Sequence, residues 1–492
     1  MPDHVASPIE EAFRRLRSEL DIPSGFPPEV LAEARQAVAA RTPVPLAGRV
    51  DRTAIPFVTI DPPGSRDLDQ AVHAERAPAG EGASDGGYRL RYAIADVGYW
   101  VERGGAIERE AWRRGVTYYA PDRREPLYPP ELSEGAASLL PDGDRPAVLF
   151  DFRLDARAEL RSWSVERAVV RSRAQLTYAD LQRWGGSAAD GDAPCEPWSE
   201  TLRLIGEIGP RRLALEAARG GVSLPVRDQH VQRRAATTLG YELVYEEPME
   251  AESWNAQVSL LTGHAAATRM LEAHVGLLRT MPAFDAGDVA KLRRIALTLG
   301  FAWPEGESYA EFMHGVRAGH PRVDVLVRQA RRVMRGAEYV AFDGAPPEQP
   351  LHGALAQVYA HATAPLRRLA DRYVLDLVVT LASGGRPTDA EVATLTALVP
   401  VMADASRRAN QLERRVVDVA EAWSLRGRCG ETFPAVVVDV RGDDVEVQVE
   451  EPPIRATVRA DGAPPPRLGA RRRVRLEGVD LEDGRIRLTL AG

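Results

Sequence analysis

Three carboxylates fall within nine positions of one short segment, and their spacing is suited to holding a metal ion. Asp61, Asp67 and Asp69 follow the apolar run of residues 55–60 and share a turn with two prolines and a glycine. A strand that ends in a tight turn is a rigid place to bring acidic side chains together, and hard oxygen ligands suit Mg²⁺ or Mn²⁺. Two such ions can bind the attacking water and the leaving oxygen of a phosphodiester.

A solvated acidic turn explains this spacing equally well, so metal chemistry and a surface turn stay open at this point. A calcium-binding EF-hand does not fit, because its ligand spacing and terminal Glu are absent.

A second cluster places Arg367 and Arg368 just before Asp371. Pro365 predicts that a helix begins here, with both arginines in its first turns. Cations at that end oppose the helix dipole unless an anion binds there as well. Two surface arginines paired with Asp371 are the simpler interpretation, and the cluster taken alone favours it. In a third segment, Tyr119 lies in a proline-containing loop and could stack on an unpaired base or could fill a core.

The elements that must position these residues change character along the chain. Residues 1–48 predict two short helices, starting at Ser7-Pro8 and at Glu29, which form either a helix-turn-helix or, more commonly for helix pairs, a packing layer. Strands are predicted over 55–60, 88–97, 147–154 and 162–171. Helices are predicted over 200–219, 254–274, 289–299, 326–335, 364–381 and 389–426. Five short strands over 434–440, 445–450, 454–459, 472–478 and 485–490 predict a small OB-type barrel.

Length and composition narrow the class of protein. The 492 residues suffice for two to four domains of about 150 residues each. No stretch approaches the roughly 18 apolar residues of a membrane-spanning helix, and two distant cysteines exclude a disulfide framework or a Cys-rich zinc site. We therefore expect a soluble, cytoplasmic protein without a membrane partner. The net charge is −8, yet 62 of its 63 basic residues are arginine, so binding of a polyanion requires arginines that line one channel.

Five segments, in order, resemble the motifs of the ribonuclease II/ribonuclease R (RNB) family of 3′→5′ exoribonucleases. They are TIDPPGSRDLDQA (59–71), YAIADV (92–97), YAPDR with the following LYPPELSEGAAS (119–138), VVRSRAQLTY (169–178) and YAHATAPLRRLAD (359–371). The resemblance implies an α+β multidomain chain. Its parts are a helical region over 1–48, a mixed α/β RNB catalytic domain over 49–428, including trailing helices 385–428, and a C-terminal OB-fold RNA-binding domain over 429–492.

The same resemblance implies roles for particular residues. Asp61, Asp67 and Asp69 correspond to metal-binding and catalytic aspartates, Gln70 to a fourth metal ligand, and Arg367 to a catalytic arginine at the scissile phosphate. The implied RNA-binding residues are Tyr119, Tyr178, Arg368 and Glu413, to which we add the basic cluster Arg471, Arg472 and Arg473 of the terminal barrel.

The implied activity is processive, metal-dependent 3′→5′ hydrolysis of single-stranded RNA to nucleoside 5′-monophosphates. The mechanism would use two metal ions, Mg²⁺ or Mn²⁺, in a monomer. Several positions depart from the family pattern: Gln70 stands where an aspartate is expected, Leu224 where a stacking phenylalanine is expected, and the segment 255–263 lacks the usual acidic and Asn positions. The alternative is therefore a catalytically weakened RNA-binding protein on the same fold.

Overall fold

The computed structural model describes residues 7–42, 44–77, 86–186, 194–224, 228–233, 240–316, 322–449, 451–460 and 464–491. The two ends of the predicted terminal domains, residues 1–6 and 492, lie outside this part. Among the described residues, no helix is long and apolar enough to cross a membrane.

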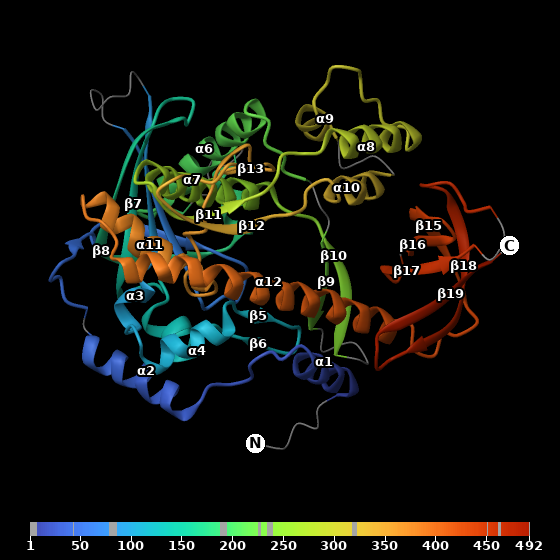
Figure 1. Ribbon diagram of the computed structural model, residues 1–492, viewed down its shortest axis with the longest axis horizontal. Helices are drawn as coiled ribbons and strands as arrows, with labels where there is room; N and C mark the ends of the chain where they lie inside the picture. The colour runs from blue at the N-terminus through green and yellow to red at the C-terminus, as the bar shows by residue number, and fades with distance from the viewer. Residues whose placement is uncertain are drawn as a thin grey trace.

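The core is a six-stranded sheet that curls back on itself (Figure 1). Its order is β1-β8-β2-β3-β4-β7, and β7 also pairs with β8. The strands are β1 (Val50–Asp51), β2 (Phe57–Ile60), β3 (Gln70–Arg76), β4 (Tyr88–Ala95), β7 (Asp144–Leu154) and β8 (Leu160–Leu176). The length of β8 allows the closure, because its first part pairs antiparallel with β7 while its last residues pair parallel with β2. The four strands predicted for this region are confirmed.

Helices cover the sheet, with α6 against β3 and α11 against β8. The helices of this part are α3 (Val97–Trp100), α4 (Ala106–Arg114), α5 (Tyr178–Gly185), α6 (Ser199–Ala218), α7 (Glu250–Glu272) and α11 (Leu369–Ala382), with a π-helical turn at Leu132–Ala136. Three short ladders pair β5 (Tyr118–Tyr119) with β6 (Arg124–Glu125), β11 (Val275–Thr280) with β12 (Glu338–Asp343), and β13 (Leu351–His352) with β14 (Gln357–Val358). The β11–β12 ladder was not predicted, because this stretch reads as mostly helical.

A smaller helical cluster stands apart from the sheet (Figure 1). It contains α8 (Ala286–Thr298), α9 (Tyr309–Gly315) and α10 (Val323–Arg331), and it has its own apolar core. The rings of Trp303 and Phe312 stack in that core with centroids 4.0 Å apart. Beside this cluster a hairpin of β9 (Asp228–Arg233) and β10 (Tyr241–Glu246), which was not predicted, contacts the long helix described next.

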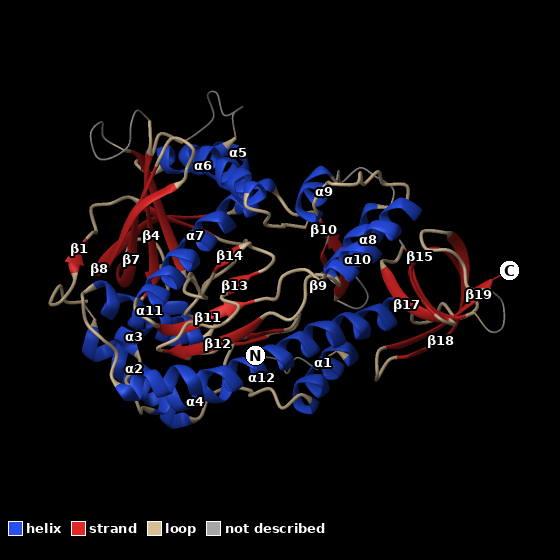
Figure 2. Cartoon of the chain, turned by 45° about the horizontal axis from the view of Figure 1, so that its top comes forward, coloured by secondary structure: helices blue, strands red, loops and turns tan. Residues whose placement is uncertain are grey.

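The 36-residue helix α12 (Asp389–Ser424) joins the core to the C-terminal barrel (Figures 1 and 2). At 1.5 Å per residue it is about 54 Å long. The barrel strands are β15 (Thr432–Arg441), β16 (Asp444–Val449), β17 (Ile454–Arg459), β18 (Arg471–Asp480) and β19 (Arg485–Ala491), in the order β17-β16-β15-β18-β19. Contacts between β17 and β19 nearly close the sheet, which confirms the predicted five-stranded OB-type barrel.

The N-terminal helices α1 (Pro8–Glu19) and α2 (Pro28–Arg41) begin and end close to the predicted positions. They rest on different parts of the molecule, α1 on α12 and α2 on α4. α1 buries Ile9, Phe13 and Leu16, and its Arg17 forms two 2.7 Å hydrogen bonds with the carboxylate of Asp122, in the β5–β6 turn. Whether the two helices also form a helix-turn-helix stays a prediction.

One predicted helix start is wrong. The helix expected from Ala364 begins at Leu369, so Arg367 and Arg368 precede it instead of lying in its first turns. The backbone of this segment forms hydrogen bonds with the segment before β5: Thr117 N donates to Arg367 O at 3.0 Å, and Leu369 N donates to Gly115 O at 3.0 Å. These hydrogen bonds hold both arginines in the loop before α11, where Arg368 is the N-cap residue of the helix.

The linker between α1 and α2 depends on one fully buried guanidinium. Arg114 of α4 donates to the carboxylate of Glu110 at 2.8 Å and to the carbonyl oxygens of Pro23 and Gly25 in the linker. We expect Arg114→Met to lower the free energy of unfolding by about 3 kcal/mol, since it leaves buried polar groups unpaired. Urea denaturation measures this.

Arg113→Met is the matched control for that substitution. Arg113 bonds the same Glu110 carboxylate, but its side chain is 54% exposed, so its loss should cost less than about 1 kcal/mol. Equal stability of the two variants would contradict the role given to Arg114.

Candidate active site

The turn that carries the three aspartates is fixed at both ends. At its start, Asp61 N donates to Leu176 O at 3.0 Å, which ties the end of β2 to the end of β8. At its end, Leu68 is fully buried, and its backbone N donates to Ser138 Oγ at 2.9 Å. Ala95 N donates to Asp69 O at 2.9 Å. The carboxylates therefore occupy defined positions and do not belong to a mobile surface turn.

The loop before α11 meets this turn at Asp69. Leu366 N donates to Asp69 Oδ1 at 2.7 Å, and Arg367 Nε lies 3.4 Å from Asp69 Oδ2. Asp69 is almost completely buried, whereas 42% of the Arg367 side chain is exposed. The predicted arginine and the predicted carboxylate therefore come together from segments nearly 300 residues apart, and the guanidinium still faces solvent.

Arg368 does not join this cluster. Its side chain turns to Asp371, with Nη2 2.8 Å from Oδ2, and the carboxylate of Asp371 also accepts from Ala364 N at 2.7 Å. Asp371 is fully buried and only 19% of the Arg368 side chain is exposed. The sequence analysis offered pairing with Asp371 as the simpler interpretation of this arginine. The structure contains that pair, but it is buried and does not lie on the surface.

The surroundings of Asp61 and Asp69 disfavour the ionised form of both carboxyl groups. Burial raises the pKa of Asp61 to about 7, and the charge of Asp67 adds to the effect. Burial likewise raises the pKa of Asp69 to about 8, although Arg367 and the backbone N of Leu366 partly offset it. Asp61 Oδ2 is buried and has no hydrogen-bond partner among the residues that the structure describes. An unpaired buried carboxylate oxygen of this kind is costly unless a cation or a proton neutralises it.

Asp67 is already neutralised by a neighbouring arginine. Arg124 Nη1 lies 2.5 Å from Asp67 Oδ1, and Arg124 Nη2 lies 2.7 Å from Glu134 Oε1. Within the described ranges, no three His, Cys, Asp or Glu side chains stand close enough to form a metal cage on their own. The donor set instead suits an ion such as Mg²⁺, which takes one or two protein carboxylates and completes its shell with water and phosphate. The residues present fit that kind of ion.

Gln70 also lies at this site, but both ends of its amide are used by the protein. Tyr92 OH donates to Gln70 Oε1 at 2.7 Å, and Gln70 Nε2 donates to the carbonyl oxygen of Thr363 at 2.5 Å. Tyr92 OH also lies 2.9 Å from Ser259 Oγ. Its role as a metal ligand stays a prediction.

Two predicted aromatic residues flank the aspartates. Tyr119 on β5 is 53% exposed, and the charges of Asp67 and Arg367 act on its hydroxyl. Tyr178 is the first residue of α5. Burial raises its pKa, with a further contribution from the charge of Asp61. Both hydroxyls therefore lie close enough to the carboxylates to feel their charge.

The remaining predicted residues lie elsewhere. Glu413 is exposed on α12, and Arg471, Arg472 and Arg473 are exposed on β18 of the barrel, far along the molecule from the sheet (Figure 1). Leu224 packs against the core of the helical cluster α8–α10. Three residues at the site were not predicted: Arg124, Tyr92 and Ser259. Arg124 and Tyr92 carried a signal, since Arg124 directly follows the YAPDR segment and Tyr92 begins the YAIADV segment.

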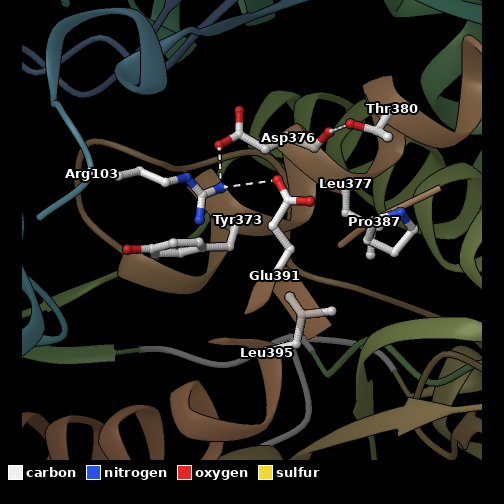
Figure 3. Close-up of a pocket in the computed structure, with 8 residues that line it drawn as sticks. All are labelled: Arg103, Tyr373, Asp376, Leu377, Thr380, Pro387, Glu391 and Leu395. Atoms are coloured by element: carbon white, nitrogen blue, oxygen red, sulfur yellow. Dashed lines mark hydrogen bonds and ion pairs between the residues drawn. The ribbon is translucent and has the colours of Figure 1, made fainter. Parts of the chain in front are cut away.

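The pocket in Figure 3 is separate from these residues. It lies beside α11 and the start of α12, where Arg103 faces both Asp376 and Glu391 at 3.5 and 3.8 Å. Because its cation is matched by two carboxylates of the protein, we regard it as a structural ion-pair site.

Comparisons with known proteins agree with this geometry. Residues 49–384 match the RNB domain, and residues 431–491 match the RNase II-type exonuclease C-terminal S1 domain. Ribonuclease R of Escherichia coli is 28% identical over 428 residues, which cover 82% of this chain and 50% of that protein. The chain thus spans about half the length of this curated relative.

Three solved structures share the fold. The apo form of Mycoplasma genitalium RNase R has a TM-score of 0.85 at 19% identity, and its complex with ribose-methylated single-stranded RNA has 0.83 at 18%. Each alignment covers 98% of this chain and 78% of that one. Yeast Ssd1, a pseudonuclease, has a TM-score of 0.66 at 18% identity, covering 85% of this chain and 51% of that one.

The raised pKa values predict how stability depends on pH in the absence of metal. A carboxyl whose pKa is raised on folding holds a proton that the unfolded chain has released, so its contribution is most favourable below about pH 4 and is lost as pH rises towards 8. Each such group changes the free energy of unfolding by up to about 1.4 kcal/mol per pH unit. In EDTA, we expect Asp69→Asn to gain stability over the wild type between pH 5 and pH 8, measured by calorimetry. A constant difference across that range would contradict the assignment.

Proposed function

We propose that this chain, which belongs to the RNB domain family, is a metal-dependent 3′→5′ exoribonuclease that releases nucleoside 5′-monophosphates. The observation that carries the proposal is the contact between Arg367 and Asp69, with 3.4 Å between Nε and Oδ2. It places a half-exposed guanidinium beside a buried carboxylate in a cluster of three aspartates, and this combination suits a phosphodiester with its metal ions.

In the proposal the three carboxylates hold the metal ions, and Asp69 also positions Arg367. Asp61 and Asp69, together with Asp67, would hold Mg²⁺ or Mn²⁺. When bound, these ions neutralise phosphate charge and lower the pKa of a water molecule. Arg367 would stabilise the charge that develops on the phosphate oxygens. Asp69 also orients Arg367 directly, since it contacts both that side chain and the backbone N of Leu366.

The tyrosines would fix the end of the RNA strand. Tyr119 and Tyr178 flank the carboxylates, and base–aromatic stacking contributes about 1–3 kcal/mol per base without demanding a sequence. The exposed arginines 471–473 of the terminal barrel, and Glu413 of α12, are proposed to contact RNA outside the site. The proposal includes single-stranded RNA as substrate, processive action, a two-metal mechanism, and a monomer in the cytoplasm.

The second candidate is an RNA-binding protein on the same fold with weakened catalysis. The observation that favours it is Gln70, whose amide contributes no negative charge at the site and whose two polar atoms bond Tyr92 and Thr363. RNA binding that survives EDTA, with no hydrolysis in Mg²⁺ or Mn²⁺, would support this candidate over the first.

An end-labelled single-stranded RNA tests the main proposal. With Mg²⁺ or Mn²⁺, a 3′-labelled strand should release labelled 5′-mononucleotide from the first turnover, and EDTA should prevent this. Asp69→Asn should reduce turnover at least about 100-fold, because it removes the charge that Arg367 and the metal both face, while RNA affinity stays within about twofold.

Asp144→Asn is the control for that variant. Asp144 is an exposed carboxylate on β7 that pairs with Arg171, and its loss should leave turnover unchanged. Near wild-type turnover by Asp69→Asn would refute the proposed site.

The barrel arginines predict a change in salt dependence. Replacing Arg471, Arg472 and Arg473 by Ala should weaken binding to single-stranded RNA and reduce the slope of log Kd against log salt by about 2, as expected from about 0.7 per lost phosphate contact. Fluorescence anisotropy over a salt series measures the slope. The variant Arg485→Ala, a 76% exposed arginine of β19 paired with Asp483, should leave it unchanged. Equal slopes for both variants would place the RNA contacts elsewhere.

A further inference from the structure

Gln70 connects three elements that meet at the site. It is the first residue of β3, its amide oxygen accepts from Tyr92 of β4 at 2.7 Å, and its amide nitrogen donates to Thr363 O at 2.5 Å. Tyr92 is 1% exposed, and its hydroxyl also lies 2.9 Å from Ser259 Oγ on α7. The side chain is therefore part of a continuous hydrogen-bonded chain from α7 through β4 and β3 to the loop before α11.

Two consecutive residues, Asp69 and Gln70, are among those that hold that loop. Asp69 accepts from Leu366 N at 2.7 Å and lies 3.4 Å from Arg367 Nε, while Gln70 donates to Thr363 O three residues earlier. Both contacts lie on the N-terminal side of Arg367, at Thr363 and at Leu366. On its C-terminal side the loop is held by Thr117 N, which donates to Arg367 O. The Gln70 contact therefore adds the tie that joins the start of the arginine loop to β3 and β4.

A neutral amide suits this connection. One end must accept a hydrogen bond from a hydroxyl and the other must donate to a carbonyl oxygen, and an amide has one group of each kind. A carboxylate at position 70 has no donor, so it would set two oxygens against each other at Thr363. It would also add a charge beside Asp61 and Asp69, whose pKa values are already raised.

We propose that Gln70 is a positioning residue, which holds the Thr363–Arg367 loop so that Arg367 lies at Asp69, and that it is not a metal ligand. This inference rests on the proposed function for its kinetic consequences. The position of the loop itself can be measured without any reaction.

Three variants test the proposal. Gln70→Met keeps the length of the side chain and removes both hydrogen bonds. Tyr92→Phe removes one buried hydroxyl that touches Gln70 and keeps the ring. Gln70→Asp creates the carboxylate that a metal-ligand role would favour. Tyr88→Phe is the matched control, because Tyr88 is a buried tyrosine on the same strand whose hydroxyl bonds Glu207 of α6 at 3.1 Å.

Hydrogen exchange gives the readout that is independent of activity. In EDTA and without RNA, backbone amides of residues 359–369 should exchange about tenfold faster in Gln70→Met and about fivefold faster in Tyr92→Phe, corresponding to one or two lost hydrogen bonds. Tyr88→Phe should exchange at the wild-type rate in this segment. Wild-type exchange in Gln70→Met would overturn the proposal.

Kinetics separate positioning from metal binding. We expect Gln70→Met and Tyr92→Phe to lower kcat with little change in the KM for RNA, and the Mg²⁺ concentration for half-maximal rate to stay within about twofold of the wild type. Gln70→Asp should also lower kcat. If Gln70→Asp raises kcat, or if Gln70→Met needs at least tenfold more Mg²⁺, position 70 is a metal ligand and the proposal fails. If the wild-type protein cleaves no RNA, the proposed function fails, while the exchange experiment still decides the role of Gln70.

Discussion

The site depends on three neighbouring aspartates whose negative charge the protein's own arginines neutralise only in part. Asp69 is buried and Asp61 is partly buried beside Asp67, and burial raises the pKa of the Asp61 and Asp69 carboxyls. Asp67 is paired with Arg124 and Asp69 faces Arg367, but within the described part of the chain Asp61 keeps one buried oxygen without a partner. Folding therefore maintains an arrangement that favours a cation or a proton. In a nuclease of this family, that unresolved charge is where divalent ions and a phosphate would gain binding energy.

Carboxylates that repel one another stay close together only where the surrounding backbone is rigid. The closed sheet supplies this rigidity, because the aspartate turn is bonded to the end of β8, to Ser138 and to β4. The arginine loop is bonded to the segment before β5 as well as to Asp69. The β5–β6 ladder that carries Tyr119 and Arg124 is tied in turn to α1 by the Arg17–Asp122 pair. The N-terminal helix thus supports the part of the site that would meet the RNA terminus.

The terminal barrel is connected to the core in a different way. Helix α12 runs from the core to the barrel (Figure 2), and its buried Glu421 accepts hydrogen bonds from Gln229 of β9 and from the backbone N of Arg455 in β17. These contacts join the long helix, the β9–β10 hairpin and the barrel at one junction. An RNA strand held by the barrel would therefore be held relative to the same helix that reaches the catalytic core.

The sequence by itself predicted most of the elements and the candidate reacting groups. Hydrophobic periodicity and turn residues located four of the six sheet strands, the long helices and the five barrel strands, since these signals are local. The motifs shared with the RNB family identified the candidate charged groups, because the spacing of the aspartates alone left a solvated turn open. The tertiary structure alone decided which partners they meet. It moved the start of α11 to Leu369, paired Arg368 with Asp371, placed Arg124 on Asp67, and bonded Gln70 to Tyr92 and Thr363. Most of these contacts join residues far apart in the chain. A local sequence pattern cannot predict them, because the closed sheet determines which donor lies within reach of which acceptor.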